Sequence, residues 1–173
     1  MKPSAEKIRE YLDYDLDTGV FRWKHRANAE PRWNTKNSGN IAGSKHNGGY
    51  THIGVEGVKY LAHHLAWVHV TGEWPSSFID HKNLNKTDNR FENLRLASFR
   101  ENSFNISVRK NSKSGFRGVC FKKQMRGWVA QITKDKRTEY LGTFDVPEKA
   151  AAVYAKRAQE LYGTYCPDYL RDM

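Results

Sequence analysis

The stretch from Asn105 to Ser114 divides the chain, because it is polar and basic and lacks the apolar periodicity of a helix or a strand. A chain of 173 residues divided there leaves two segments, each able to bury a modest core. We therefore predict an α+β protein with four parts. These are a β-rich lead-in at residues 1–60, a central module at 61–105, a basic linker at 106–114 and a C-terminal domain at 115–173.

The first two parts show short alternating and helical patterns. Ile8, Tyr11 and Leu12 recur at helical spacing, and residues 50–61 predict a hairpin with Glu56-Gly57 at its turn. Residues 31–43 are polar and predict a loop. The central module predicts a helix from Leu61 that ends at Thr71-Gly72, a strand at residues 78–81, a polar loop at 82–90, and a turn and helix within 91–105.

The C-terminal domain predicts three strands followed by one helix. The strands are expected at residues 116–121, 128–133 and 138–144. The helix begins near Pro147, has an alanine-rich apolar face and ends at Gly163. Three antiparallel strands packed on one helix form a plausible two-layer domain.

Charge indicates a nucleic acid as partner. The formal net charge is +10 at pH 7, and a surplus of this size favours a polyanion, although it can also serve solubility alone. Its distribution favours the first reading, because aromatic residues alternate with ten basic residues between Ser107 and Arg137. The ten are Arg109, Lys110, Lys113, Arg117, Lys122, Lys123, Arg126, Lys134, Lys136 and Arg137.

Other classes are disfavoured. The sequence contains no apolar run of the roughly 20 residues that a spanning helix needs, and no secretory signal is expected at the N-terminus. Cys120 and Cys166 make neither a disulfide framework nor a zinc motif. These features predict a reduced, soluble, cytoplasmic protein that is not secreted.

The residues that could carry chemistry are Asp80, His81, Asn93 and Asn102. A neutral imidazole with a pKa near 6.5 suits a general base, and a carboxylate with an amide oxygen suits a hard divalent cation. Together these groups could hydrolyse a phosphodiester. Because neighbouring strand residues point to opposite faces, Asp80 and His81 can share the site only if the strand end bends.

Each of these residues also has a structural reading. An Asp-His pair in a loop is usually a surface pair, and asparagines in polar loops usually form turns. His63 and His64 point about 100° apart on a helix, so packing or hydrogen bonding is a better reading for either than metal binding. No role is assigned to the other four histidines, which are His25, His46, His52 and His69.

The run Ile79-Asp80-His81-Lys82-Asn83, residues 86–96 and Arg100-Glu101-Asn102 resemble the HNH endonucleases of phages and mobile introns. The resemblance covers about residues 10–105. It implies a ββα-metal module in which His81 deprotonates water, Asn93 fixes the loop, and Asp80 and Asn102 hold one Mg²⁺ or Mn²⁺. Asn102 stands where many members carry histidine, which favours oxygen-preferring metals over zinc, so no structural zinc is expected. Asn105 is the alternative to Asn102.

Residues 114–168 resemble the AP2/ERF DNA-binding domain, whose blocks recur in order at Ser114–Val119, Gly127–Ile132, Tyr140–Phe144 and Ala150–Tyr154. The resemblance implies a three-stranded sheet laid in the DNA major groove. Arg117, Lys122, Arg126, Trp128 and Tyr140 match the family's contact strands, and Trp128 and Tyr140 could instead pack under the sheet. With Lys123 and the linker residues Arg109, Lys110 and Lys113, they form the predicted DNA-binding set.

The sequence thus predicts a site-preferring endonuclease of the homing type, acting on double-stranded DNA as a monomer in a bacterial or phage-infected cell. Two other functions remain open. One is a DNA-binding regulator with a degenerate HNH module, which the intact Asp80, His81, Asn93 and Asn102 disfavour. The other is a structural or RNA-binding protein, which the absence of an RNA-type aromatic motif disfavours.

Overall fold

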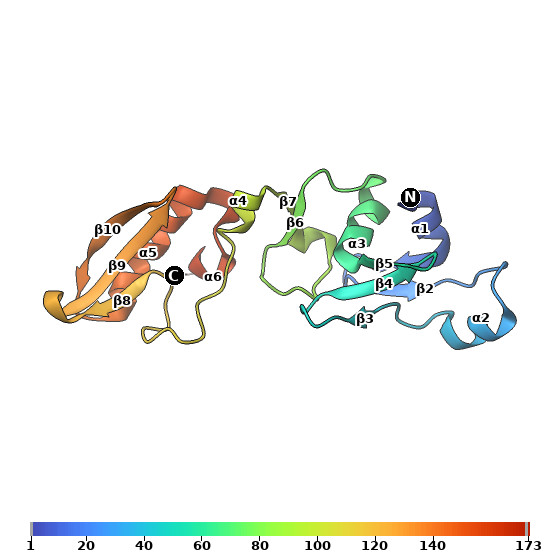
Figure 1. The fold of residues 1–173 in the computed structure, drawn as a ribbon, viewed down its shortest axis with the longest axis horizontal. Helices are drawn as coiled ribbons and strands as arrows, with labels where there is room; N and C mark the ends of the chain where they lie inside the picture. The colour runs from blue at the N-terminus through green and yellow to red at the C-terminus, as the bar shows by residue number, and fades with distance from the viewer. Residues whose placement is uncertain (1, 172) are drawn as a thin grey trace. The chain divides into compact units, whose positions relative to one another are not determined.

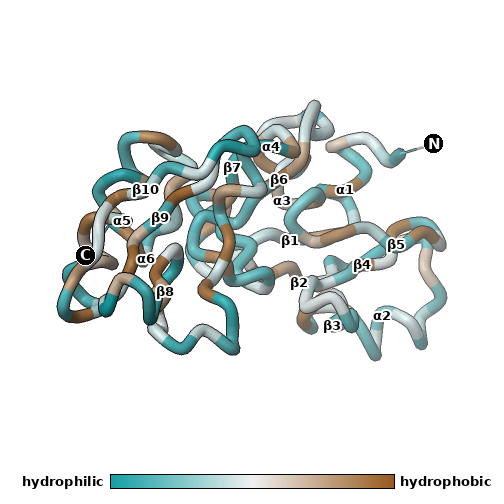
Figure 2. Tube along the Cα trace, turned by 60° about the vertical axis from the view of Figure 1, so that its left-hand side comes forward, coloured by the Kyte–Doolittle hydropathy of each residue, from teal (hydrophilic) through white to brown (hydrophobic). Residues whose placement is uncertain are grey.

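The computed structural model describes residues 2–171 and 173 of the chain, which divide into two compact units, residues 1–98 and residues 99–173 (Figure 1). Each unit combines short helices with antiparallel strands, in agreement with the predicted α+β class. Apolar residues alternate with polar ones along these elements (Figure 2). Within the described residues, no helix combines the length and the hydropathy needed to cross a membrane.

The first unit contains most of the short strands. Its elements are α1 (Ala5–Tyr11), β1 (Leu12–Tyr14), β2 (Phe21–Trp23), α2 (Pro31–Asn37), β3 (Ser44–Lys45), β4 (Thr51–Val55), β5 (Val58–Leu61), α3 (Ala62–Thr71), β6 (Phe78–His81), the 3₁₀ turn η1 (Phe91–Asn93) and β7 (Leu94–Ala97). The strands pair as β1–β2, β3–β4–β5 and β6–β7, and every pairing is antiparallel.

Several local predictions are confirmed. The hairpin of β4 and β5 turns at Glu56 and Gly57, which have φ of +52° and +79°. Helix α3 ends at Gly72, whose left-handed φ of +85° suits a residue without a Cβ. The cap of α1 was not predicted: the hydroxyl of Ser4 accepts a hydrogen bond from the Lys7 amide at 3.2 Å.

Two local predictions are wrong. Residues 31–43 were expected to be a loop, but they contain the helix α2, which begins at Pro31 and buries none of its residues. A helix without a buried face leaves no apolar period in the sequence. Within residues 91–105, strand β7 lies between the expected turn and the expected helix. Its four residues are too few to show alternation, and pairing with β6 supports it instead.

One hydrophobic core runs through the first unit from end to end. Ile8, Leu12, Ile53, Leu65 and Val68 are almost completely buried. Leu94, near the end of the unit, belongs to the same core. The lead-in and the central module of the sequence analysis therefore share one core, which sets β6 beside α3 and the β4–β5 hairpin.

The second unit consists of one three-stranded antiparallel sheet and one long helix that covers it. Its elements are α4 (Phe99–Asn102), β8 (Val119–Lys122), the 3₁₀ turn η2 (Lys123–Met125), β9 (Gly127–Lys134), β10 (Arg137–Phe144), α5 (Pro147–Tyr162), the 3₁₀ turn η3 (Gly163–Tyr165) and α6 (Asp168–Arg171). The sheet order is β10–β9–β8. Ala151, Tyr154, Ala155 and Ala158 of α5 pack against Ala130 and Ile132 of the sheet.

The boundary between the units lies between Ser98 and Phe99. Residues just after the boundary pack on the second unit. The ring of Phe104 stacks on Tyr162 with centroids 4.3 Å apart, and the hydroxyl of Tyr169 donates to the Ile106 carbonyl at 3.0 Å. Arg100 forms an ion pair with Asp135 in the β9–β10 turn.

Candidate active site

Asp80 and His81 end strand β6, and both side chains are about 95% buried. Asp80 lies opposite Arg95 in the β6–β7 register. Its Oδ2 accepts hydrogen bonds from Nε and Nη2 of Arg95 at 2.8 Å and 2.6 Å. The sequence analysis gave Arg95 no role. A guanidinium at this distance compensates the buried negative charge of the carboxylate.

The His81 ring lies in an aromatic environment. It packs at right angles to His63 with ring centroids 5.0 Å apart, and Tyr50 lies 6.1 Å away on the same measure. Burial lowers the pKa of His81, an effect partly opposed by the Asn89 side chain and by Asp80 and Asp88. The imidazole is therefore neutral near pH 7, the state in which it can accept a proton.

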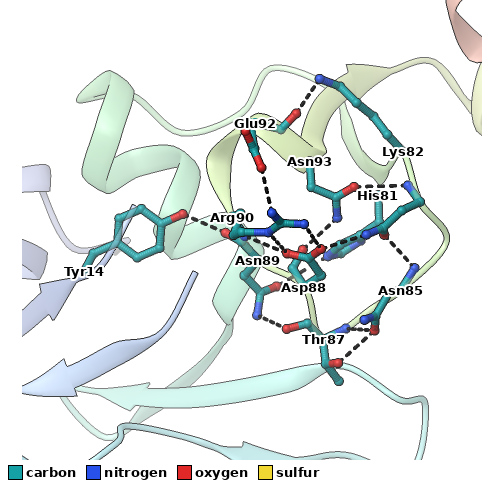
Figure 3. A network of polar contacts seen from close by, with 11 residues as sticks. Tyr14, His81, Lys82, Asn85, Thr87, Asp88, Asn89, Arg90, Glu92 and Asn93 are labelled. Atoms are coloured by element: carbon teal, nitrogen blue, oxygen red, sulfur yellow. Dashed lines mark hydrogen bonds and ion pairs between the residues drawn. The ribbon is translucent and has the colours of Figure 1, made fainter. Parts of the chain in front are cut away.

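Asn93 closes the loop that follows β6 (Figure 3). Its Oδ1 accepts a hydrogen bond from the Asn83 amide at 3.1 Å, and its Nδ2 donates to the Asp88 carbonyl at 2.8 Å. Its own carbonyl accepts from the Lys82 amide at 2.9 Å. One buried side chain thus ties both ends of the loop together.

Charged and polar side chains stiffen the same loop from outside. Asp88 accepts hydrogen bonds from Arg90, which lowers the pKa of that carboxyl to about 2. Arg90 also donates to Glu92 at 2.8 Å. Near the middle of the loop, Oδ1 of Asn85 accepts from the amide and the hydroxyl of Thr87. The loop is therefore held by its own side chains on one side and by Asn93 on the other.

Asn89 is a member of this loop that the sequence analysis did not single out. It is 4% exposed, and its Oδ1 lies 3.4 Å from Nε2 of His81. The Tyr14 hydroxyl donates to its backbone carbonyl at 2.7 Å (Figure 3). No signal in the sequence separates Asn89 from the other loop asparagines, since all of them fit a turn-forming reading.

His63 is the second residue that sequence reasoning undervalued. It is 4% exposed on α3, and burial lowers its pKa to about 3. His64, its neighbour, lies with its ring centroid 4.6 Å away. The packed role expected for one of this pair therefore belongs to His63, whose ring forms one wall around His81.

The predicted metal ligands lie in different units. Asp80 belongs to the first unit, Asn102 is exposed at the end of α4 in the second, and Asn105 is buried there. Among the described residues, no cluster of three or more His, Cys, Asp or Glu side chains could hold a metal. Asp80 supplies a carboxylate oxygen, a donor that suits a hard cation. The Arg95 contact does not exclude this, because an ionised carboxylate offers about four lone-pair sites.

Several basic residues predicted to bind DNA lie on the sheet side of the second unit. Lys123 and Arg126 are exposed at the β8–β9 turn, and Lys122 ends β8. Tyr140 pairs with Gln131 across β9 and β10 and is 56% exposed. Arg109, Lys110 and Lys113 are exposed before β8.

Two members of the predicted DNA-binding set are engaged inside the second unit. Trp128 packs against the core that α5 covers, which is the packing reading left open above. Arg117 is partly buried, donates to the Phe104 carbonyl at 2.6 Å and lies over the Tyr162 ring. Arg117 therefore also holds the chain segment after α4 in place.

The chain is similar to known proteins of viral origin and to one protein family. The HNH endonuclease family matches residues 60–104. Protein 3.8 of Escherichia phage T7 is 31% identical over 104 residues, which cover 60% of this chain and 85% of that protein. Uncharacterized HNH endonuclease L560 of Acanthamoeba polyphaga mimivirus is 35% identical over 97 residues, which cover 56% of this chain and 49% of that protein. No solved structure matches the chain.

Proposed function

We propose that this chain, which belongs to the HNH endonuclease family, is a metal-dependent enzyme that hydrolyses phosphodiester bonds in duplex DNA. The observation that carries the proposal is the state of His81. It is a buried, neutral imidazole at a strand end, beside a carboxylate and a loop fixed by Asn93. This arrangement can receive the proton of an attacking water.

Each residue has one task in the proposed reaction. His81 accepts the proton of the water that attacks phosphorus. Asn93 keeps the loop closed, so that the backbone after His81 does not shift when DNA binds. Arg95 holds the carboxylate of Asp80 in one orientation through its two hydrogen bonds.

We propose Asp80 and Asn102, with Asn105 as the alternative to Asn102, as the ligands of one Mg²⁺ or Mn²⁺. A hard divalent cation would supply positive charge to the phosphate and to the departing 3′-oxygen. Carboxylate and amide oxygens prefer such cations over zinc. Arg95 holds the carboxylate of Asp80 in a defined orientation for this task.

The second unit is proposed to anchor the duplex. Its resemblance to the AP2/ERF domain, its exposed Lys123, Arg126 and Tyr140 and its half-buried Lys122 favour binding through the sheet. Cleavage at preferred sites, as in homing-type enzymes, would follow from this anchor. We further propose that the chain acts as a monomer in the cytoplasm of a bacterial or phage-infected cell, since one relative is a phage protein.

The test removes the proposed base. With Mg²⁺ or Mn²⁺, the full chain is expected to cut or nick duplex DNA, and EDTA is expected to stop it. His81→Ala should lower the cleavage rate by about 10²- to 10⁴-fold, the usual contribution of a general base, and should retain DNA affinity. His25→Ala, at an exposed histidine of the same unit, is the matched control and should cut normally. Cleavage at the normal rate by His81→Ala would remove His81 as the base.

One observation favours a second candidate, a DNA-binding regulator without catalysis. The Asp80 carboxylate is already compensated by Arg95 within the protein, so the pair is satisfied without a cation. A wild-type chain that binds duplex DNA tightly and leaves it intact with either cation would support that candidate.

A further inference from the structure

We propose that Asn89 is a positioning residue that keeps the proton of His81 on Nε2, so that Nδ1 is the basic nitrogen, and that Tyr14 and Gly19 hold Asn89 in place. The inference deepens the proposed function and rests on it for its catalytic consequence. Which nitrogen of the His81 ring carries the proton can be measured without DNA or metal.

The amide orientation of Asn89 is fixed by its second hydrogen bond. Nδ2 of Asn89 donates to the Thr87 carbonyl at 3.3 Å, and a carbonyl oxygen can only accept. Oδ1 must then be the atom that lies 3.4 Å from Nε2 of His81. An amide oxygen also can only accept, so the contact is a hydrogen bond only when Nε2 carries the proton.

The backbone of Asn89 is held from the β1–β2 turn. Tyr14, at the end of β1, is 8% exposed and donates its hydroxyl proton to the Asn89 carbonyl at 2.7 Å. Gly19 lies against the same backbone. A Cβ on Gly19 would be 2.3 Å from the Arg90 nitrogen and 2.5 Å from the Asn89 carbonyl carbon. The turn can therefore approach the loop this closely only with glycine at position 19.

The loop is anchored on both sides of Asn89. On one side, the Asp88 carbonyl accepts a hydrogen bond from Asn93 at 2.8 Å. On the other side, the Arg90 side chain is paired with Asp88 at 2.7 Å. Asn89 therefore stands on a fixed backbone within a closed loop (Figure 3). A side chain so placed can hold the His81 ring through a single hydrogen bond.

The tautomer matters because the two ring nitrogens face different directions. If the proton moved to Nδ1, the basic nitrogen would face Asn89 rather than the attacking water. A base that spends part of its time in the wrong tautomer loses a corresponding part of its contribution to the rate.

The test reads the imidazole directly. The full chain is labelled with ¹⁵N in its histidines, kept metal-free at pH 8, and studied by spectra that correlate ring protons with ring nitrogens. The His81 signals are identified by their loss in His81→Gln. We expect one pyrrole-type nitrogen at Nε2 and one pyridine-type nitrogen at Nδ1. Asn89→Ala should bring the ¹⁵N chemical shifts of Nε2 and Nδ1 toward each other. Asn89→Asp keeps a hydrogen-bond acceptor and should preserve the difference between the two shifts.

Two further variants sharpen the result. Tyr14→Phe leaves the Asn89 side chain intact and should give a smaller shift in the same direction. Thr87→Val retains the carbonyl that Asn89 uses and should leave the His81 shifts unchanged. In cleavage assays, Asn89→Ala should lower kcat by about 10- to 100-fold with little change in KM, and Asn89→Asp should recover most of the loss.

A wild-type His81 with its proton on Nδ1 would overturn the proposal, and so would unchanged shifts in Asn89→Ala. If the shifts behave as expected while the wild-type chain does not cleave DNA, the positioning role stands and the proposed function fails. The two failures are thus distinguishable.

Discussion

At the residue scale, the neutral histidine beside His81 has a measurable effect on stability. His63 is almost fully buried, and burial lowers its pKa from 6.5 to about 3. Its folded-state pKa lies below its unfolded value, so below pH 6.5 the unfolded chain binds a proton that the folded chain excludes. The free energy of unfolding therefore falls progressively as the pH decreases from 6.5 toward 3, because protons bind His63 in the unfolded chain only.

We predict that the free energy of unfolding of the first unit falls by about 2 kcal/mol more between pH 7.5 and pH 5 in the wild type than in His63→Phe. Urea denaturation followed by tryptophan fluorescence measures this, because four of the five tryptophans lie in the first unit. His25→Phe, at an exposed position, should show the same fall in the free energy of unfolding between pH 7.5 and pH 5 as the wild type. An equal fall in the wild type and in His63→Phe would show that His63 does not cause this pH dependence.

Sequence reasoning predicted the candidate site residues whose side-chain chemistry is unusual for their setting. Asp80, His81 and Asn93 could be predicted because a carboxylate, an imidazole and an amide recur there in a family pattern. Asn89 and Arg95 could not, because their roles depend on which atoms the fold brings within hydrogen-bond distance. The pairing of Asp80 with Arg95 follows from the β6–β7 register, and strand β7 itself was missed.

At the element scale, glycine determines where strand β8 begins. The sequence predicts a strand from Phe116, but β8 starts at Val119, directly after Gly118. Gly118 has a φ of +71°, which is left-handed, and its missing Cβ leaves room for the ring of Tyr154 on α5. The apolar pattern of residues 116–121 cannot reveal this, because it contains no information about the helix that packs there. The three strands and α5 were nevertheless correctly placed in order.

We predict that Gly118→Ala destabilises the second unit more than Gly115→Ala does. A Cβ at position 118 would lie 2.1 Å from the Tyr154 ring and 2.7 Å from the Gln131 carbonyl, whereas one at 115 meets nothing within 4 Å. Both positions carry the cost of a left-handed alanine, about 1–2 kcal/mol, so the difference isolates the steric clash. Hydrogen exchange of the β9 amides measures it. Equal protection in the two variants would contradict the predicted contact.

At the scale of the whole molecule, the chain divides its charge and its candidate chemistry between two units. Asp80, His81 and Asn93 lie in the first unit, and the exposed basic residues near the sheet lie in the second. The exact boundary could not be predicted, because it depends on Phe104 and Arg100 packing on the second unit.

We predict that Lys122→Gln with Lys123→Gln weakens DNA binding and lowers the slope of log K against log salt concentration by up to about 1.8, since each lost phosphate contact contributes about 0.9. The matched control is Lys149→Gln with Lys156→Gln, which removes the same charge from exposed positions on α5. Titrations at several salt concentrations measure both. An equal loss of slope in the two pairs would exclude the sheet as the anchor.

The continuous core of the first unit has a consequence for transplanting that unit. The family match begins at residue 60, yet Ile8 and Leu12 share a core with Leu65 and Leu94. A fragment that starts at the edge of the match would lack Ile8 and Leu12 and would leave the core side chains that pack against them facing water. Grafts, fusions and natural recombination can therefore exchange this unit only as one piece that starts ahead of Ile8.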